Sequence, residues 1–269
     1  MKNTKIIVAG ILGLTLAFGT TSCKKKGCTD SVATNYDAKA KKDDGSCQFD
    51  TTGHANHEGS HIMIKMNHNY SGATVIPSDF NDLKYTNDLG TTHSITKLQY
   101  LVSDFVLYKA DGDSIVVEGY NLVDFTNTNS FAYSFPSELH VPLGDYTGIG
   151  FTWGVDEDDN TSGAYADLNA ASWSWPAMIG GGYHFMKFEG KFIDSNTDTT
   201  AFAFHNGTAS NSGTHEANHF YVKLNQSFTL SNDASISVDM NLAEWFKSPN
   251  QWDLNAMHAM LMPNYNAQI

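Results

Sequence analysis

The chain has few prolines, few cysteines and few basic residues for its length. Its 269 residues include 6 Pro, 3 Cys and 16 Lys and Arg, against 29 Asp and Glu, which gives a formal net charge of -13. The scarcity of proline, together with 12% aromatic residues, argues against a disordered stalk. The acidic balance disfavours a nucleic-acid partner, because phosphate backbones select basic protein faces.

Sequence motifs of the common enzyme classes are also missing. The chain contains no nucleophile elbow, no phosphate-binding glycine loop and no dinucleotide-binding fingerprint. Residues 215–219 do match the H-E-x-x-H pattern of zinc proteases. That chemistry needs a helix to point both imidazoles at one Zn²⁺, whereas this segment follows Gly- and Asn-rich turns and leads into a strand pattern. We therefore predict that the protein is not an enzyme, and a zinc hydrolase with Glu216 as its base is a distant alternative.

The first 23 residues have the layout of a bacterial lipoprotein signal. Lys2 and Lys5 precede an uncharged apolar run at residues 6–19, and small residues then lead to Cys23. This run is shorter than the roughly 20 residues that span a bilayer. The sequence predicts a signal peptide over residues 1–22, lipidation of Cys23 and a membrane anchor that faces the periplasm or the cell surface. An ordinary secretory signal followed by an incidental cysteine is the alternative.

A polar linker is predicted over residues 23–61. It holds Cys28 and Cys47, which we expect to form a disulfide because an exported chain meets an oxidising compartment. The residues around them resemble a short cysteine module of exported Bacteroidetes proteins. Calcium is an alternative ligand for the acidic residues at 30, 43 and 44 and for the acidic turn at 156–160, although solvated loops explain both more simply. Histidines at 54, 57 and 61 would bind metal only weakly.

Residues 62–269 are predicted to form one β domain with its own core. Alternating apolar and polar residues mark short strands, separated by Gly, Asn and Ser turns. The predicted strands cover residues 61–70, 97–108, 114–118, 119–125, 146–154, 183–192, 201–205, 220–226 and 234–240. One or two short helical turns are expected at 241–246. The pattern favours an antiparallel β-sandwich, immunoglobulin-like or related, with a closed barrel as the alternative.

The order of these segments resembles the MbnP-like copper-binding family, whose name comes from a protein encoded beside methanobactin genes. The matching stretches are ITKLQYLVSDF at 95–105, GYNLVD at 119–124, FTWGVD at 151–156, WSW at 173–175, GYHFMKFEG at 182–190, FH at 204–205, VDMNLAEWF at 238–246 and MH at 257–258. The resemblance implies an exported β domain that binds copper, in some relatives with help from an oxidised tryptophan. It also leads us to expect a residue such as Lys in place of His184, and a further strand beyond Ile269.

Histidines are the candidate copper ligands, because copper in an oxidising compartment accepts imidazole and thioether and the cysteines are otherwise engaged. We predict His68, His205 and His258, which all lie in stretches that match the family. His68 lies on the apolar face of the first strand, His205 ends a strand, and His258 lies between Met257 and Met260. Each histidine also has a plainer interpretation as a hydrogen-bonded structural residue, and the methionines as core residues.

The competing function is a β-sandwich module that binds a glycan or a cell-envelope protein without a metal. Trp173 and Trp175 would then be exposed and would stack on the ligand. If an oxidised tryptophan takes part in copper binding, the candidates are Trp153, Trp173 and Trp175, but packing as core aromatics explains all three more simply.

Overall fold

The computed structural model describes residues 25–29, 33, 35–42, 46, 48, 59–247 and 249–269. The chain forms two compact units, Met1–Asn56 and His57–Ile269. In the described part of the first unit, Cys28 is buried and forms an isolated β-bridge with Tyr36. The signal segment, Cys23 and Cys47 lie outside the described residues, so lipidation and the disulfide stay predictions. Within the described ranges, no helix has the length and apolar character needed to cross a membrane.

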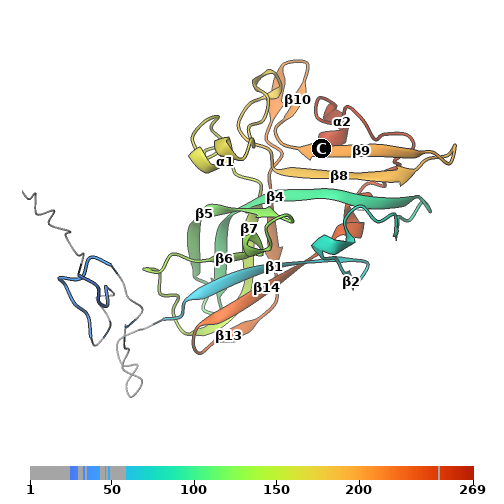
Figure 1. Ribbon diagram of the computed structural model, residues 1–269. Helices are drawn as coiled ribbons and strands as arrows, with labels where there is room; N and C mark the ends of the chain where they lie inside the picture. Colours follow the sequence, from blue (N-terminus) through green and yellow to red (C-terminus); the bar gives the residue numbers. More distant parts are fainter. Residues whose placement is uncertain are drawn as a thin grey trace, which may run out of the picture. The chain divides into compact units, whose positions relative to one another are not determined.

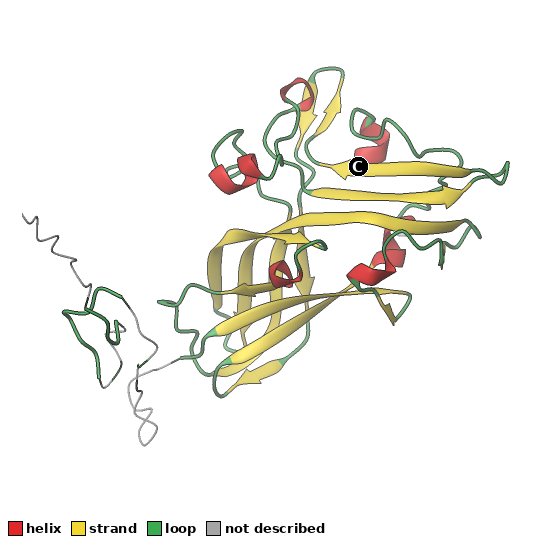
Figure 2. Ribbon diagram, viewed as in Figure 1, coloured by secondary structure: helices red, strands yellow, loops and turns green. Residues whose placement is uncertain are grey.

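The second unit is built from short strands with little helix (Figures 1 and 2). The strands are β1 (Ile62–Tyr70), β2 (Ala73–Thr74), β3 (Tyr85–Thr86), β4 (Thr92–Lys109), β5 (Ser114–Asp124), β6 (Ala132–Ser134), β7 (Gly144–Trp153), β8 (Met186–Ile193), β9 (Thr199–Asn206), β10 (Ala209–Asn211), β11 (Thr214–Glu216), β12 (Phe220–Leu224), β13 (Phe228–Leu230) and β14 (Ala234–Asn241). The helices are the α-helices α1 (Ala166–Ala170) and α2 (Tyr265–Gln268) and the 3-10 helices η1 (Pro77–Asp79), η2 (Thr128–Phe131), η3 (Ala177–Ile179) and η4 (Leu242–Phe246).

Two sheets form a β-sandwich, which confirms the predicted fold class. The larger sheet has the order β12-β7-β4-β8-β9, with β3, β5 and β13 paired onto it. The smaller sheet has the order β14-β1-β2, with β6 paired to β1. Strand β4 connects the larger sheet, because its first half pairs with β8 and its second half with β7. Among the described strand pairs, only β1–β14 is parallel.

The hairpin of β4 and β5 contains a β-bulge at the position where the sequence predicts a break between two strands. The sequence pattern predicts two strands that meet at Gly119, whereas β5 continues through this residue. Opposite it, the register shifts between Ser103 and Phe105 of β4. Both Asp104 and Gly119 have a positive φ, 51° for Asp104 and 110° for Gly119. A bulge therefore absorbs the extra residue, and glycine accepts the left-handed backbone at little cost.

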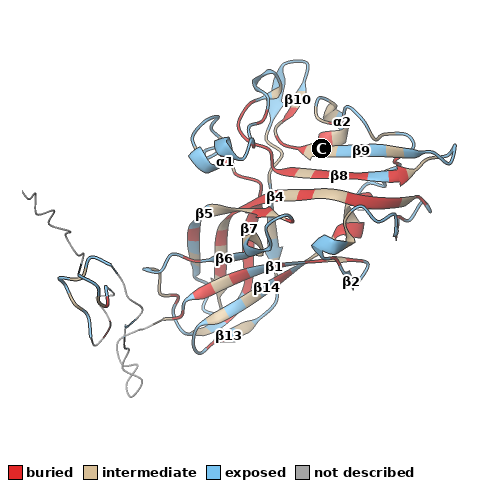
Figure 3. Cartoon of the chain, viewed as in Figure 1, coloured by how far each residue is buried: buried red, intermediate tan, exposed pale blue. Residues whose placement is uncertain are grey.

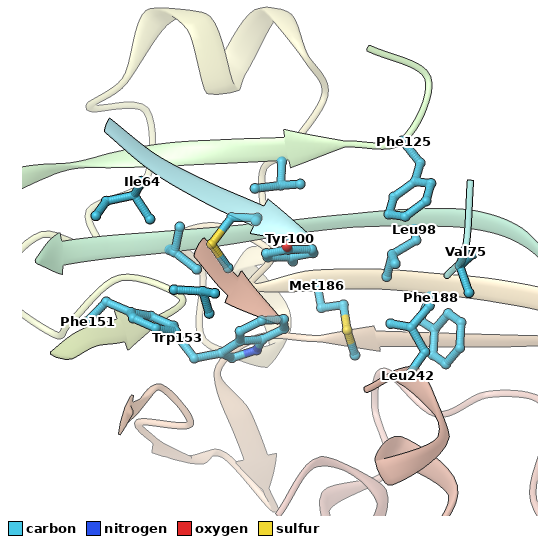
Figure 4. Packing of buried hydrophobic residues seen from close by; sticks show 14 of the residues in the cluster. Ile64, Val75, Leu98, Tyr100, Phe125, Phe151, Trp153, Met186, Phe188 and Leu242 are labelled. Atoms are coloured by element: carbon cyan, nitrogen blue, oxygen red, sulfur yellow. The ribbon is translucent and has the colours of Figure 1, made fainter. Parts of the chain in front are cut away.

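The main hydrophobic core is made of buried residues from both sheets, and Figure 3 shows buried segments along β1, β4 and β8. Ile64 of β1, Tyr100 of β4, Trp153 of β7 and Phe188 of β8 lie in one cluster (Figure 4). The rings of Tyr100 and Trp153 are stacked, with their centroids 4.7 Å apart. Burial of each such side chain contributes roughly 1.5–3 kcal/mol. The apolar side chains that alternate along the strands therefore provide the main stabilisation of the sandwich.

A second, smaller cluster lies on the opposite face of the larger sheet. It contains Leu101 of β4, which follows core residue Tyr100 and therefore points the other way. Its other buried members come from the connection between β7 and β8, and they are Val155, Leu168, Trp173, Tyr183 and Phe185. This cluster fixes the connection against the sheet and so positions the residues that it carries, among them His184.

Candidate functional site

His68 lies in the main core, on β1. Its side chain is 4% exposed, and its Nε2 is 2.8 Å from the hydroxyl of Tyr100. The rings of Phe125 and Phe131 pack against it at centroid distances of 4.4 and 5.0 Å. Burial lowers the pKa of His68 to about 4. His68 is therefore a neutral, hydrogen-bonded histidine between the two sheets.

His205 points to the opposite side of the larger sheet. Its neighbour on β8 is Lys187, whose own neighbour on β4 is Gln99. The next residue along β4, Tyr100, faces the core, and its hydroxyl is hydrogen-bonded to Nε2 of His68. Because successive strand residues face opposite sides, the larger sheet separates His205 from His68.

His258 lies against the outer edge of β9. Its carbonyl oxygen accepts a hydrogen bond from the amide of Ala203, and its Nδ1 is 3.0 Å from the carbonyl oxygen of Leu254. Its ring centroid is 5.4 Å from that of Phe192 on β8. Phe192 comes five residues after Lys187, the neighbour of His205, which is about 16 Å along a strand. The structure thus places the three predicted ligands in three different surroundings.

His205 instead lies beside His184, which the sequence interpretation did not choose. The two imidazole centroids are 5.4 Å apart, with the ring planes at 72°. Nδ1 of His184 is 2.9 Å from the carbonyl oxygen of Trp173. Nε2 of His205 is 2.8 Å from Oε1 of Glu189. Since a carbonyl or carboxylate oxygen accepts, each imidazole donates from the named nitrogen and, when neutral, keeps a lone pair on its other nitrogen.

Both imidazoles are held in the neutral form. Burial lowers the pKa of His184 to about 4. Burial also lowers the pKa of His205, although Glu189 opposes the shift. The pKa of Glu189 itself falls despite its burial, because Lys97 and His205 hydrogen-bond to the carboxylate. Neutral imidazole is the form that binds a metal ion.

Two buried tryptophans enclose His184. The centroid of Trp175 is 5.0 Å from the imidazole, in an edge-to-face arrangement, and that of Trp173 is 5.6 Å away. The indole Nε1 of Trp175 donates to the carbonyl oxygens of Ile179 and Thr208. Trp173 is 0% exposed and Trp175 is 2% exposed. The expectation that these two rings stack on a glycan at the surface is therefore wrong.

The profile of the MbnP family matches residues 59–263. The chain belongs to the MbnP family. Among solved structures, MbnP from Methylosinus trichosporium is similar, at 13% sequence identity and a TM-score of 0.49, over 73% of this chain and 79% of that chain. No curated protein matches.

Among the described residues of this MbnP-family chain, the other metal motifs do not assemble; the acidic residues at 30, 43 and 44 and the histidines at 54 and 57 lie outside the described ranges. His215 and Glu216 lie in strand β11 and are exposed, and Glu216 accepts a hydrogen bond from the hydroxyl of Tyr265. The helix that a zinc-protease site needs is absent from this described segment. Over the described part of the chain, no group of three or more His, Cys, Asp and Glu side chains is arranged to hold a metal ion. This result covers the acidic turn at 156–160 and the set His68, His205 and His258.

The strand pattern contains a signal that points to His184. The predicted strands 183–192 and 201–205 follow each other in the chain, and the eight residues between them are mostly Asp, Asn, Ser and Thr, which predicts a turn that pairs the two strands. In an antiparallel hairpin the start of the first strand lies beside the end of the second, and the observed register sets Lys187 opposite His205. Hairpin geometry therefore brings His184 and Glu189 close to His205. The contribution of Trp173 and Trp175 depends on packing of a long connection, which no local period encodes.

Proposed function

We propose that this MbnP-family protein is an exported, lipid-anchored protein that binds copper through His184 and His205 and is not an enzyme. The observation that carries the proposal is the pair of neutral imidazoles with centroids 5.4 Å apart. Two imidazoles that each place a nitrogen about 2.0 Å from one ion would have centroids about 5–6 Å apart. The ring separation therefore suits two ligands of a single ion.

Copper suits this site better than zinc. Protein sites hold zinc with four ligands, or with three and a water molecule, and no three-residue set of His, Cys, Asp and Glu forms in the described ranges. Reduced copper accepts a lower coordination number, and imidazole is among the ligands it takes. Membership of the MbnP family supports the same metal.

Groups behind the two ligands would orient them. Glu189 accepts the Nε2 proton of His205, and the Trp173 carbonyl accepts the Nδ1 proton of His184. Such partners fix the ring orientation and make the free nitrogen more basic. Lys97 donates to the same Glu189 oxygen, at 2.9 Å, and keeps the carboxylate in place.

Replacement of His205 by Ala is expected to weaken copper binding by about 100-fold or more. One of the two imidazole ligands is lost, and the neighbouring Glu189 has no imidazole to replace it. The measurement is competition with a chromogenic Cu(I) chelator, on untagged protein. His184→Ala should have the same effect. His258→Ala is the matched control, since its ring lies outside the pair, and it should bind as the wild type does. Wild-type affinity in both His184→Ala and His205→Ala would refute the site.

The anchor is tested by Cys23→Ser. The positive residues, the apolar run and the small residues before Cys23 support lipidation at this thiol. We expect the wild-type chain in the membrane fraction, with a mass that includes acyl groups. Cys23→Ser should lose the acyl mass and appear in the soluble fraction or as uncleaved precursor. Cys28→Ser is the control and should keep the lipid, whereas an unchanged acyl mass in Cys23→Ser would contradict the proposal.

A further inference from the structure

A pocket of about 350 Å³ lies on the other side of β9 from the histidine pair. Phe204 lines it, and because Phe204 precedes His205 in the strand, the two side chains point to opposite faces. Further walls come from Phe220 of β12, Trp245 of η4 and Trp252. Helix α2, which Figure 1 shows beside β9, completes the lining with Gln268. The pocket is therefore separate from the proposed copper ligands.

The lining has an unusual composition for so acidic a chain. Of the fifteen lining residues, six are Asn or Gln and four are Phe or Trp. Among these described lining residues, none has an ionisable side chain, although the chain carries a net charge of -13. The lining side chains therefore offer no counter-ion to a charged ligand. Amide groups both donate and accept hydrogen bonds, and aromatic faces accept flat apolar surfaces.

The aromatic walls are held in place before any ligand arrives. Trp252 stacks on Phe246, with centroids 5.2 Å apart and planes at 9°, and it also packs against Phe204 at 5.6 Å. Trp245 packs against Trp153 of the main core at 5.3 Å. Rings that are already ordered cost little entropy on binding. Because the rings already pack against the core, the pocket does not need to rearrange when a ligand binds.

Amide groups are fixed in a similar way. The side chain of Gln268 donates to the carbonyl oxygens of His205 and Leu261, at 2.8 and 3.0 Å. Asn218 donates to the carbonyl oxygens of Gly207 and Gln268. These amides hold the floor of the pocket, while the exposed Asn250 and Gln251 lie on its lining. A ligand would thus meet rigid aromatic faces together with exposed donors and acceptors.

We propose that this pocket binds a neutral carbohydrate. A sugar ring offers an apolar C–H face to the aromatic side chains and hydroxyl groups to the amides, and it carries no charge. Ligand sites range from about 300 to 1,000 Å³, and this volume lies at the lower end, which suits roughly one or two sugar rings. Among the aromatic lining residues, Phe220 is the exposed one, at 47%, so its ring can be reached from solvent. The proposal does not depend on copper.

The test uses the full mature chain in the presence of a metal chelator. Isothermal titration calorimetry and tryptophan fluorescence are measured against neutral hexasaccharides of the cello-, laminari-, manno- and xylo- series, with oligogalacturonate as the charged comparison. We expect at least one neutral hexasaccharide to bind and Phe220→Ala to weaken it by 10-fold or more. Tyr221→Ala is the matched control: it is the next residue, 46% exposed, and hydrogen-bonded to Tyr108 instead of lining the pocket.

The outcomes separate cleanly. Should Phe220→Ala fail to fold, Gln251→Ala replaces it, because this exposed residue also lines the pocket. Selective loss in a pocket variant, with Tyr221→Ala unaffected, supports the proposal. No binding of any neutral hexasaccharide, equal loss in Tyr221→Ala, or a preference for oligogalacturonate overturns it. Since copper is absent throughout, none of these results bears on the copper site.

Discussion

Replacement of Trp173 by Ala is expected to lower the free energy of unfolding by about 4 kcal/mol. Trp173 is 0% exposed and is the largest side chain of the cluster on the outer face of the larger sheet. Its removal leaves a cavity beneath the connection that carries His184. Urea-induced unfolding, followed by circular dichroism, measures the change. The same variant should weaken copper binding, because the carbonyl that orients His184 is displaced.

Trp173→Phe is the matched control, and its cost should be about 1–2 kcal/mol. The indole Nε1 of Trp173 has no hydrogen-bond partner among the described residues, so phenylalanine forfeits no hydrogen bond. It also keeps an aromatic face for Lys187, whose Nζ lies 4.5 Å from the Trp173 ring centroid. A loss below 1 kcal/mol in Trp173→Ala would show that the connection is positioned by something other than this cluster.

Strand positions could be read from the sequence, but strand partners could not. Alternation marks β1 and β14 almost residue by residue, because each strand buries one face. The parallel pairing of Ile62 with Ala234 joins segments far apart in the chain. The alternation of apolar and polar residues within a strand does not indicate which other strand it pairs with. The first part of β4 was also missed. His93 and Ser94 are polar yet fully buried, so burial there depends on neighbouring elements.

The candidate site was predictable to a similar extent. His205, one of the three predicted ligands, lies at the end of β9 beside His184, whereas His184 and Glu189 become its neighbours through hairpin register. His68 has the plainer role foreseen for it, a hydrogen-bonded core residue. Trp173 looked exposed because it lies in a Gly- and Asn-rich connection. Packing of that connection onto Leu101 buries it, and this is a tertiary effect.

Acidification from pH 7.5 to 5 is expected to remove about 2 kcal/mol of stability through His93 alone. His93 is 0% exposed, and its ring centroid is 4.4 Å from that of Phe246. Burial lowers its pKa to about 4, although a hydrogen bond to Thr91 opposes the shift, whereas the unfolded chain has a value near 6.5. The unfolded state therefore binds the proton first. The contribution of His93 to the free energy of unfolding is therefore complete above about pH 6.5. It declines as the pH falls, and it levels off below about pH 4, near the pKa of the folded state.

His93→Phe tests this expectation. Nε2 of His93 has no hydrogen-bond partner among the described residues, so phenylalanine keeps the ring packing and loses only the weak bond to Thr91 at 3.3 Å. Between pH 7.5 and 5 the variant should lose about 2 kcal/mol less stability than the wild type in urea unfolding. It should keep part of the acid sensitivity, since burial also lowers the pKa of His68 to about 4. Identical pH dependence in both proteins would show that His93 does not titrate as a buried group.

This variant also separates two effects of acid on copper. Protons compete with the metal for His184 and His205 directly, and acid also destabilises the fold through His93. Because His93 lies on a buried part of β4 that packs on Phe246, its replacement leaves the histidine pair untouched. Copper released at pH 5 by a folded His93→Phe protein would come from protonation of the ligands. Copper retained by the variant but released by the wild type would instead trace the release to unfolding.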